Sequence, residues 1–188
     1  ARGGHAVHPE SCEDACMESR EEIMGWRRAE RERLINARMA LSVAQRQEAS
    51  ARIIGRVDAW CRTRALLVPG VIVSGYWPLR GEPDLRPWLA SLVDAGLTCA
   101  LPVVVEKGAP LQFRAWRPGC AMEKGFWNIP VPAAATPVTP DVLLAPVVGF
   151  DEANYRLGYG GGYFDRTLDQ LRKLGLRYHA IGVGYAMA

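Results

Sequence analysis

Strand-like and helix-like segments alternate along most of the chain, and this order constrains the fold more than any other feature. Apolar, β-branched runs predict strands at 66–77, 98–106, 111–116, 142–148 and 178–185. Helical patterns at 85–95 and 164–174 lie between strands, and each ends at a glycine, Gly96 or Gly175. Such alternation predicts an α/β domain with an open, mixed, largely parallel sheet flanked by helices on both faces. In sheets of this kind, ligands bind beyond the carboxyl ends of the strands.

The chain ahead of these segments divides into an extension and a helical region. Residues 1–22 show no apolar periodicity, which predicts a flexible N-terminal extension. A helical pattern begins at Ile23 and runs to Met39, and Ser42 is placed to cap a second helix over 43–62. We therefore expect a single domain over 23–188. The last segment, IGVGYAMA, is strand-like without a closing turn, so we expect this domain to lack its C-terminal end.

Composition excludes several classes of protein. With 188 residues, 49% of them hydrophobic and 23% charged, the chain can bury the core of one domain, which excludes wholesale disorder. It holds no uncharged apolar run of about 18 residues, which excludes a membrane-spanning helix. Its net charge of +3, from 23 basic and 20 acidic side chains, is too balanced for a typical nucleic-acid-binding protein.

Cysteine and histidine are used sparingly. The five cysteines are an odd number without dense spacing, and no signal peptide precedes them, so we expect reduced thiols and a cytoplasmic location. Cys12 and Cys16 form a weak candidate metal site, because no second pair has matching spacing. Of the three histidines, only His179 lies within the expected domain, which disfavours a Ser-His-Asp or Cys-His enzyme.

The segment 156–166, RLGYGGGYFDR, is the strongest candidate for chemistry. It joins a buried strand to a helix, and its glycines allow a ligand to approach backbone N–H groups at the helix start, as phosphate-binding loops do. No Gly-Lys-Ser/Thr follows, so it is not a Walker A loop, and Tyr163 stands where the Rossmann fingerprint needs glycine. A plain connecting turn is the alternative explanation. That turn would not need an arginine, two tyrosines and an aspartate around four glycines.

The same segment resembles the signature of the 5-formyltetrahydrofolate cyclo-ligase family. The preceding Pro146, Gly149, Phe150 and Asp151 are similar to the residues ahead of that signature. Two further stretches, YWPLRGE at 76–82 and WNIPVP at 127–132 after Phe113 and Trp116, resemble the family in order and spacing. The resemblance implies ATP-driven cyclisation of 5-formyltetrahydrofolate to 5,10-methenyltetrahydrofolate, with release of ADP and phosphate. The formyl oxygen would attack the γ-phosphate, N10 would close on the activated carbon, and no protein nucleophile would be needed.

The resemblance also implies roles for individual residues. ATP binding is expected of Arg27, Arg31, Arg156, Leu157, Gly158, Tyr159, Gly160, Gly161, Gly162, Tyr163 and Phe164. Substrate binding is expected of Tyr76, Trp77, Glu82, Trp127, Tyr159 and Tyr163. Catalysis is expected of Arg156, Tyr163 and Asp165, with Asp165 also a Mg²⁺ ligand. The chain departs from the family at Phe164, where a second tyrosine is usual, and it ends before the family's second acidic metal ligand.

Ordinary structural explanations compete for several of these residues. Arg27, Arg31 and Arg38 lie on one helical stripe, but Glu30 and Glu32 share the helix, and by itself the pattern favours a solvated face. The resemblance favours ATP for the first two, which match the family's basic-x3-Arg pair. Glutamates in loops are mostly surface residues, and tryptophans mostly belong to cores. Asp165 could serve only the helix dipole.

These inferences together predict an enzyme, a ligase that acts as a monomer on 5-formyltetrahydrofolate and ATP without nucleic-acid or membrane partners. A non-catalytic folate- or nucleotide-binding relative of the same fold is the alternative, because one expected metal ligand is missing. A nucleic-acid-binding protein that uses the arginine-rich helix is disfavoured by the balanced charge.

Overall fold

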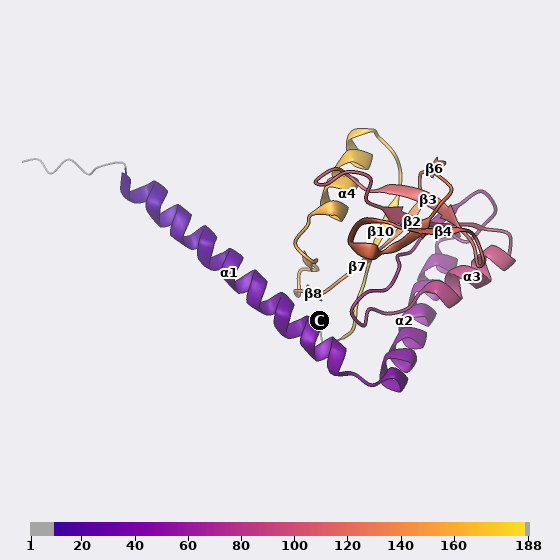
Figure 1. Cartoon of the computed structure of the whole chain (residues 1–188), viewed down its shortest axis with the longest axis horizontal. Coiled ribbons are helices and arrows are strands. Elements are labelled where there is room, and N and C mark those ends of the chain that lie inside the picture. Colours follow the sequence, from indigo (N-terminus) through magenta and orange to yellow (C-terminus); the bar gives the residue numbers. More distant parts are fainter. Residues whose placement is uncertain (1–9, 187–188) are drawn as a thin grey trace, which may run out of the picture.

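A six-stranded sheet forms the centre of the computed structural model, which describes residues 10–186, with side chains from residue 19 (Figure 1). The strands are β1 (Ile72–Ser74), β2 (Thr98–Val103), β3 (Gln112–Trp116), β6 (Pro137–Val138), β7 (Val142–Pro146) and β10 (His179–Val183). Their order across the sheet is β10-β7-β1-β2-β3-β6. The first four strands in this order run parallel, whereas β3 and β6 are antiparallel to their neighbours. The predicted mixed, largely parallel sheet is confirmed.

Side chains of the central strand β7 alternate between two apolar cores, as the period of two in a strand requires. Val142 and Leu144 face a core shared with α2 (Val43–Thr63) and α3 (Arg86–Asp94). Leu143 faces the opposite core, which includes Leu171 of α4 (Tyr163–Lys173). All three strand residues are fully buried, and each such side chain stabilises the fold by about 1.5–3 kcal/mol. Helices therefore flank both faces of the sheet, as predicted.

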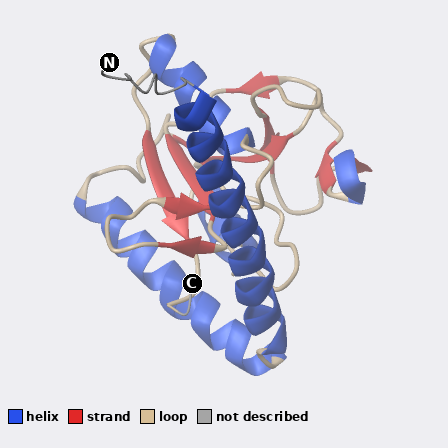
Figure 2. Cartoon of the chain, turned by 90° about the vertical axis from the view of Figure 1, so that its left-hand side faces the viewer, coloured by secondary structure: helices blue, strands red, loops and turns tan. Residues whose placement is uncertain are grey.

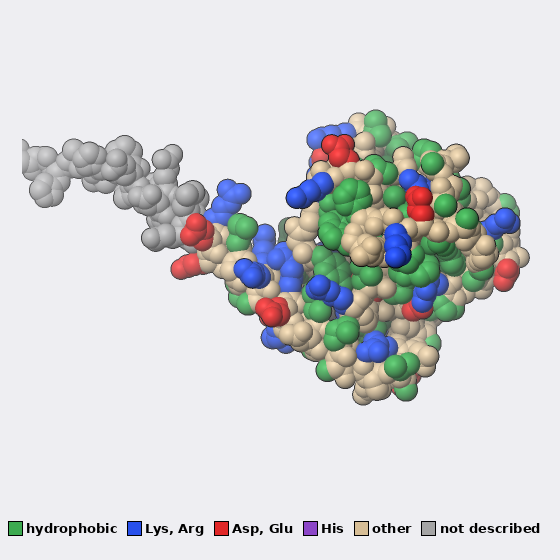
Figure 3. Space-filling view, in the orientation of Figure 1, with side chains coloured by type: hydrophobic (Ala, Val, Ile, Leu, Met, Phe, Trp, Pro, Cys, Tyr) green, Lys and Arg blue, Asp and Glu red, His purple; other side chains and the backbone are tan. Residues whose placement is uncertain are grey.

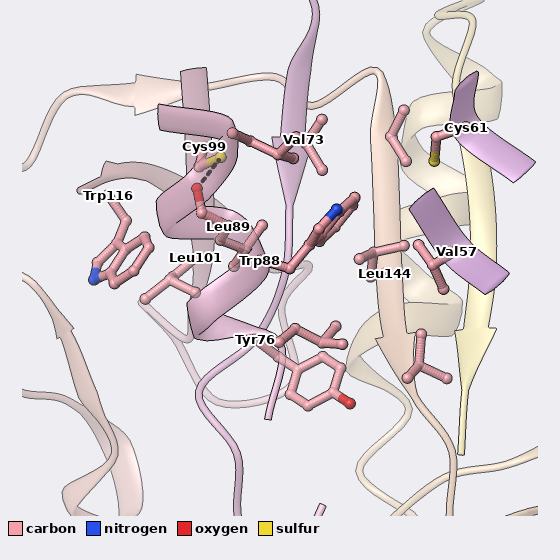
Figure 4. Packing of buried hydrophobic residues seen from close by; sticks show 14 residues of the cluster. Val57, Cys61, Val73, Tyr76, Trp88, Leu89, Cys99, Leu101, Trp116 and Leu144 are labelled. Atoms are coloured by element: carbon pink, nitrogen blue, oxygen red, sulfur yellow. Dashed lines mark hydrogen bonds between the residues drawn. The ribbon is translucent and has the colours of Figure 1, made fainter. Parts of the chain in front are cut away.

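The larger core joins α2 and α3 to the sheet (Figure 4). Val57 and Cys61 of α2 and Leu89 of α3 pack over the strands. The indole Nε1 of Trp88 donates a hydrogen bond to Asp58 Oδ1 at 2.9 Å, which ties the two helices to each other. This rigid layer supports the loops that follow the carboxyl ends of the strands.

The first helix, α1 (Glu10–Ala40), projects from the body, and only its C-terminal part packs against it (Figures 1 and 2). Leu34 is its main apolar contact, and it leaves no room for a side chain at Gly149, where a Cβ would lie 2.6 Å from Leu34 Cδ1. Residues 10–22, where a flexible extension was expected, are helical. Five of these thirteen residues are Glu, a good helix former, and none is proline or glycine, so helix formation there needs no apolar face. Residues 1–9 lie outside the described part of the chain.

A turn shortens the first predicted strand, and short elements occupy the chain between the predicted strands at 111–116 and 142–148. The apolar run from residue 66 becomes a strand only at Ile72, because Pro69 and Gly70 form a turn closed by a bond from Val71 N to Val68 O. Residues 117–140, which are rich in proline, contain additional short elements. They are β4 (Met122–Lys124), the 3-10 turn η1 (Phe126–Asn128), β5 (Pro130–Pro132) and β6. A further hairpin, β8 (Gly149–Phe150) with β9 (Arg156–Leu157), precedes the glycine segment.

Across residues 10–186, no helix has the length and apolar character needed to cross a membrane.

Candidate active site

The glycine loop, residues 158–162, connects β9 to α4 and is surrounded by guanidinium groups. Gly160 and Gly162 have φ values of +97° and +65°, a left-handed conformation that glycine adopts without strain. A Cβ at Gly158 would lie 2.7 Å from Arg156 Nη1, and one at Gly160 would lie 3.4 Å from Arg31 Cζ. The missing side chains let positive charge lie directly against the backbone. An anion of phosphate size would find both guanidinium donors and the N-terminal end of α4 there.

Arg31 links α1 to the glycine loop. Its Nε donates a hydrogen bond of 2.7 Å to the carbonyl oxygen of Gly158. Arg27, one turn earlier on the same stripe, is exposed. Figure 3 shows Lys and Arg side chains along α1 up to the place where it meets the body. The helix therefore brings a basic surface to the loop, as the resemblance implies for an ATP site.

Arg156 and Asp165 face each other across the loop. Arg156 Nη2 donates to Asp165 Oδ1 at 2.6 Å, and its guanidinium lies 5.6 Å from the centre of the Phe164 ring. The Asp165 side chain is 70% exposed in the first turn of α4. One carboxylate oxygen is thus held by a cation while the carboxylate remains open to solvent.

Glu82 lies in a tight turn after β1. Leu79 N donates to Glu82 Oε2 at 2.8 Å, and Arg80 and Gly81 at the centre of the turn have φ of 45° and 76°. Glu82 is only 6% exposed, and its Oε1 has no hydrogen-bond partner among the described residues. Burial raises the pKa of this carboxyl, and the Leu79 N–H, the charge of Arg38 and the nearby Tyr159 hydroxyl partly oppose that shift. A buried acceptor without a partner is costly, so a ligand N–H group that reached this oxygen would satisfy it.

Aromatic side chains flank the loop from the other side. Trp127 is 63% exposed in η1, and its ring centre lies 5.6 Å from that of Tyr163 at an interplanar angle of 78°. Trp127 and Asn128 have positive φ, 54° and 59°, which is strained for residues with side chains. The Tyr163 hydroxyl accepts a bond from Gly108 N. The exposed indole face beside the glycine loop suits a flat heterocycle.

Tyr76 and Trp77, which were predicted to bind the substrate, make other contacts in the structure. Tyr76 is buried, and its hydroxyl donates to the carbonyl of Pro83 behind the Glu82 turn. Trp77 is covered by the guanidinium of Arg86, 4.5 Å from the ring centre. It lines a separate surface cavity of about 510 Å³, together with Trp116 and residues 117–120, that includes no glycine-loop residue. The structure does not bring Trp77 to the other candidate residues.

The described residues offer little for nucleophilic catalysis. Burial raises the pKa of the Cys61 thiol to about 11 and that of Cys99 to about 12, so neither is a thiolate near neutral pH. His179 lies on β10, with its ring 5.8 Å from that of Trp60. The candidate site is therefore one that positions ligands and balances charge. The side chains of Cys12 and Cys16 lie outside the described part of the structure.

Comparison with known proteins identifies the family. Residues 23–186 match the model of the 5-formyltetrahydrofolate cyclo-ligase family. The chain belongs to this family. It is 34% identical to the 5-formyltetrahydrofolate cyclo-ligase of Escherichia coli K12 over 159 residues, 79% of this chain and 81% of that protein. The cyclo-ligase of Mycolicibacterium smegmatis is 37% identical over 111 residues, 55% of this chain and 57% of that protein.

Solved cyclo-ligase structures share the fold. The 5,10-methenyltetrahydrofolate synthetase of Aquifex aeolicus has a TM-score of 0.68 at 26% identity, covering 85% of this chain and 78% of that one. The synthetase of Mycoplasma pneumoniae has a TM-score of 0.64 over 86% of both chains, and at 23% identity it supports the fold alone. Family membership makes the chain a ligase of folate one-carbon metabolism.

Several residues of this cyclo-ligase site escaped the sequence-based assignment. Arg38 was noticed only as part of the basic stripe, yet it is 3% exposed and contacts the Glu82 turn. Arg166 Nη2 donates to Gly161 O at 2.6 Å, and its guanidinium lies 5.0 Å from the Tyr163 ring centre. Tyr185 donates to the carbonyl of Gly81. The position of Arg166 in the signature was the available signal, whereas Tyr185 had none.

Proposed function

We propose that the chain catalyses the ATP-driven cyclisation of 5-formyltetrahydrofolate to 5,10-methenyltetrahydrofolate, releasing ADP and phosphate. Family membership supports the folate chemistry. The observation that carries the nucleotide half is the approach of Arg31 and Arg156 to the glycine loop, where Arg31 Nε donates to Gly158 O at 2.7 Å and a Cβ at Gly160 would lie 3.4 Å from Arg31 Cζ. Guanidinium groups and backbone N–H groups at a helix start are the means by which proteins hold a triphosphate.

The proposed reaction needs positioning more than protein nucleophiles. The formyl oxygen of the folate would attack the γ-phosphorus, and the bond from that phosphorus to ADP would break. N10 would then attack the phosphorylated carbon, lose its proton, and expel phosphate as the ring closes. Arg31 and Arg156 would hold and neutralise the phosphates, while Tyr159 and the residues of the glycine loop would orient them.

The folate would lie between the Glu82 turn and Trp127. The unpartnered Oε1 of Glu82 would accept from the N–H groups of the pterin, and the exposed indole of Trp127 would stack on the ring beside Tyr163. Tyr76 would support the Glu82 turn from behind through its bond to Pro83. A direct contact of Trp77 with the folate stays a prediction.

Asp165 fits a cation that is shared with the nucleotide. Mg²⁺ in nucleotide sites uses one or two carboxylates together with waters and phosphate oxygens. Asp165 supplies one exposed carboxylate at the glycine loop, and no cluster of three or more His, Cys, Asp or Glu occurs in the described part of the chain. We propose that Asp165 holds Mg²⁺ jointly with the phosphates of ATP. The ion would there neutralise charge on the transferred phosphoryl group.

Absorbance of the methenyl product tests the proposed function. Purified chain with 5-formyltetrahydrofolate, ATP and Mg²⁺ should accumulate that product, and omission of ATP should abolish it. Binding of both substrates without turnover would contradict the proposal and favour the non-catalytic alternative. Gel filtration with light scattering tests the predicted monomer, and the cytoplasmic location stays a prediction from cysteine usage.

A further inference from the structure

Arg38 is a buried arginine without a direct carboxylate partner. It is 3% exposed, and none of the ion pairs among the described residues includes it. Burying an unpaired guanidinium costs several kcal/mol of desolvation, which other contacts must offset. Its enclosure sets it apart from Arg31 of the same helix, which is half-buried. Its burial needs another explanation.

The contacts of Arg38 join three segments that are distant in sequence. Its Nε donates to the carbonyl of Arg80 at 2.9 Å, across 42 residues, within the Glu82 turn. Its Nη2 donates to the hydroxyl of Tyr159 at 2.5 Å, across 121 residues, within the glycine loop. One side chain of α1 therefore connects the proposed pterin loop with the proposed phosphate loop.

Tyr159 is oriented by this contact. The Arg38 guanidinium also lies 5.8 Å from the centre of the Tyr159 ring, and the Tyr159 hydroxyl is 3.5 Å from the carbonyl oxygen of Leu79. The ring itself is 40% exposed, so its outer face stays available while the hydroxyl points toward the Glu82 turn. Without Arg38, this hydroxyl would lose its charged donor.

Among the described residues, Arg38 is the cation that shifts the pKa of Glu82. The charge of Arg38 from α1 and the hydroxyl of Tyr159 from the glycine loop both act on its carboxyl, whose own charge acts on Tyr76 after β1 and Tyr185 after β10, while a Cβ at the neighbouring Gly81 would lie 3.5 Å from Arg46 Cδ of α2. The three tyrosines carry no positive charge. Arg38 thus supplies the positive potential that favours the ionised carboxylate over the protonated acid in this dry turn.

We infer that Arg38 is a positioning residue, which fixes Tyr159 and the Leu79–Glu82 turn so that Glu82 Oε1 is presented to the pterin. The inference rests on the proposed function and adds to it a residue that does not touch either substrate. Its removal should weaken folate binding through Glu82. ATP binding should be largely retained, because Arg31 and Arg156 hold the phosphates.

Three variants test this role, with the affinity for 5-formyltetrahydrofolate measured by calorimetry between pH 5 and 8. Arg38→Met should bind the folate more than tenfold more weakly near pH 7. The acid limb of its pH profile, where binding is lost as pH falls, should move to higher pH. Arg38→Lys keeps a charge near Glu82 and should restore the position of that limb. Tyr159→Phe removes only the bridging hydroxyl from a half-exposed ring, so it should fold normally even where Arg38→Met does not, and it should lose folate affinity several-fold.

Arg28→Met is the matched control, since Arg28 is an exposed arginine of the same helix. It should leave folate affinity and its pH profile unchanged. The affinity for a non-hydrolysable ATP analogue should change less than threefold in Arg38→Met. If Arg38 only stabilised the fold, Arg38→Met would have a lower melting temperature and would lose affinity for both ligands to the same extent. The acid limb of its pH profile would then stay at the wild-type pH.

The outcomes separate the two levels of the proposal. A wild-type chain that fails to bind 5-formyltetrahydrofolate would overturn the proposed function, and this inference with it. A wild-type chain that binds the folate, with Arg38→Met and Tyr159→Phe variants of unchanged affinity and pH profile, would overturn the role of Arg38 alone.

Discussion

Arg156 and Asp165 form an ion pair across the glycine loop, with Nη2 and Oδ1 2.6 Å apart. The arginine side chain is 20% exposed and the aspartate 70% exposed. The pair therefore joins a largely buried cation to an anion that water still reaches. Such a pair adds little stability, about 0–1 kcal/mol, because solvent screens it. Its position, with one partner proposed for phosphate and the other for Mg²⁺, points to a functional use of both charges.

Asp165→Asn tests that use. The change removes the carboxylate but keeps the size, so the melting temperature should move by no more than about 3 °C. Turnover should fall at least tenfold, and the Mg²⁺ concentration needed for half-maximal activity should rise. The control is Asp169→Asn, because Asp169 lies one turn later in α4 and pairs with Arg172 and Lys173. Equal effects of the two substitutions on Mg²⁺ dependence would contradict the metal role of Asp165.

Arg31→Ala should weaken ATP binding. Charge-assisted hydrogen bonds to phosphate are worth about 1.5–3 kcal/mol, so the dissociation constant should rise roughly ten- to a hundredfold. Calorimetry with a non-hydrolysable ATP analogue measures the change. Arg28→Ala removes the same charge from an exposed position of α1 and should have little effect. If α1 presents only a solvated face, the two variants will bind the analogue alike.

Gly160→Ala should disturb the glycine loop specifically. Its φ of +97° is unfavourable for alanine, and the new Cβ would lie 3.4 Å from Arg31 Cζ. ATP affinity should drop at least tenfold while circular dichroism stays native. Gly55→Ala is the matched control, because nothing lies within 4 Å of a Cβ at that position of α2. It should stabilise the helix slightly, by about 0.5–1 kcal/mol, and leave ATP binding intact.

Glu82→Gln should separate the folate from the nucleotide. The substitution places a donor where the pterin needs an acceptor, at a cost of roughly 1–3 kcal/mol, so the KM for 5-formyltetrahydrofolate should rise about tenfold or more. The KM for ATP should barely move. Steady-state kinetics with each substrate varied in turn measures both values. An equal rise for both substrates would mean that the pterin is not bound by this turn.

The same variant should change the pH dependence of stability. Burial raises the pKa of Glu82 above its ordinary value of 4.5, so the folded chain binds this proton more tightly than the unfolded chain does. The Glu82 contribution to stability is thus present at low pH and is lost as pH rises through the folded pKa. Near pH 7, Glu82→Gln should melt at a higher temperature than the wild type. Thermal scans should show this advantage shrinking toward pH 4.

Trp127 combines backbone strain with an exposed indole. Its φ of 54° costs about 1–2 kcal/mol for a residue with a side chain. Trp127→Gly should therefore be more stable than Trp127→Ala by about 0.5–1 kcal/mol, since glycine relieves the strain but adds freedom to the unfolded chain. Both variants should lose folate affinity equally, because both lack the ring. If the two variants differed in folate affinity in the same order as in stability, the result would argue against stacking of the indole on the folate.

The sequence alone was sufficient for the order of layers and for the glycine loop. Alternating strand and helix patterns predicted the sheet and its helices because apolar periodicity is a local property of the chain. The glycines, Arg156 and Asp165 lie within ten consecutive positions, so their proximity follows from chain connectivity. Apolar periodicity does not predict the helix over residues 10–22, because helix propensity without an apolar face is sufficient there.

Only the tertiary structure decided which distant residues meet. Arg27, Arg31 and Arg38 form one stripe on a helix in the sequence. In the structure, Arg27 is exposed, Arg31 contacts the glycine loop, and Arg38 is buried beneath the Glu82 turn. Trp77 was expected to bind the substrate, as was Glu82, and in the structure its ring packs under Arg86. Periodicity tells which residues share a face, and it cannot tell which loops that face will contact. That depends on how α1 crosses the body, where Leu34 packs against Gly149 and sets which turn of the helix reaches which loop.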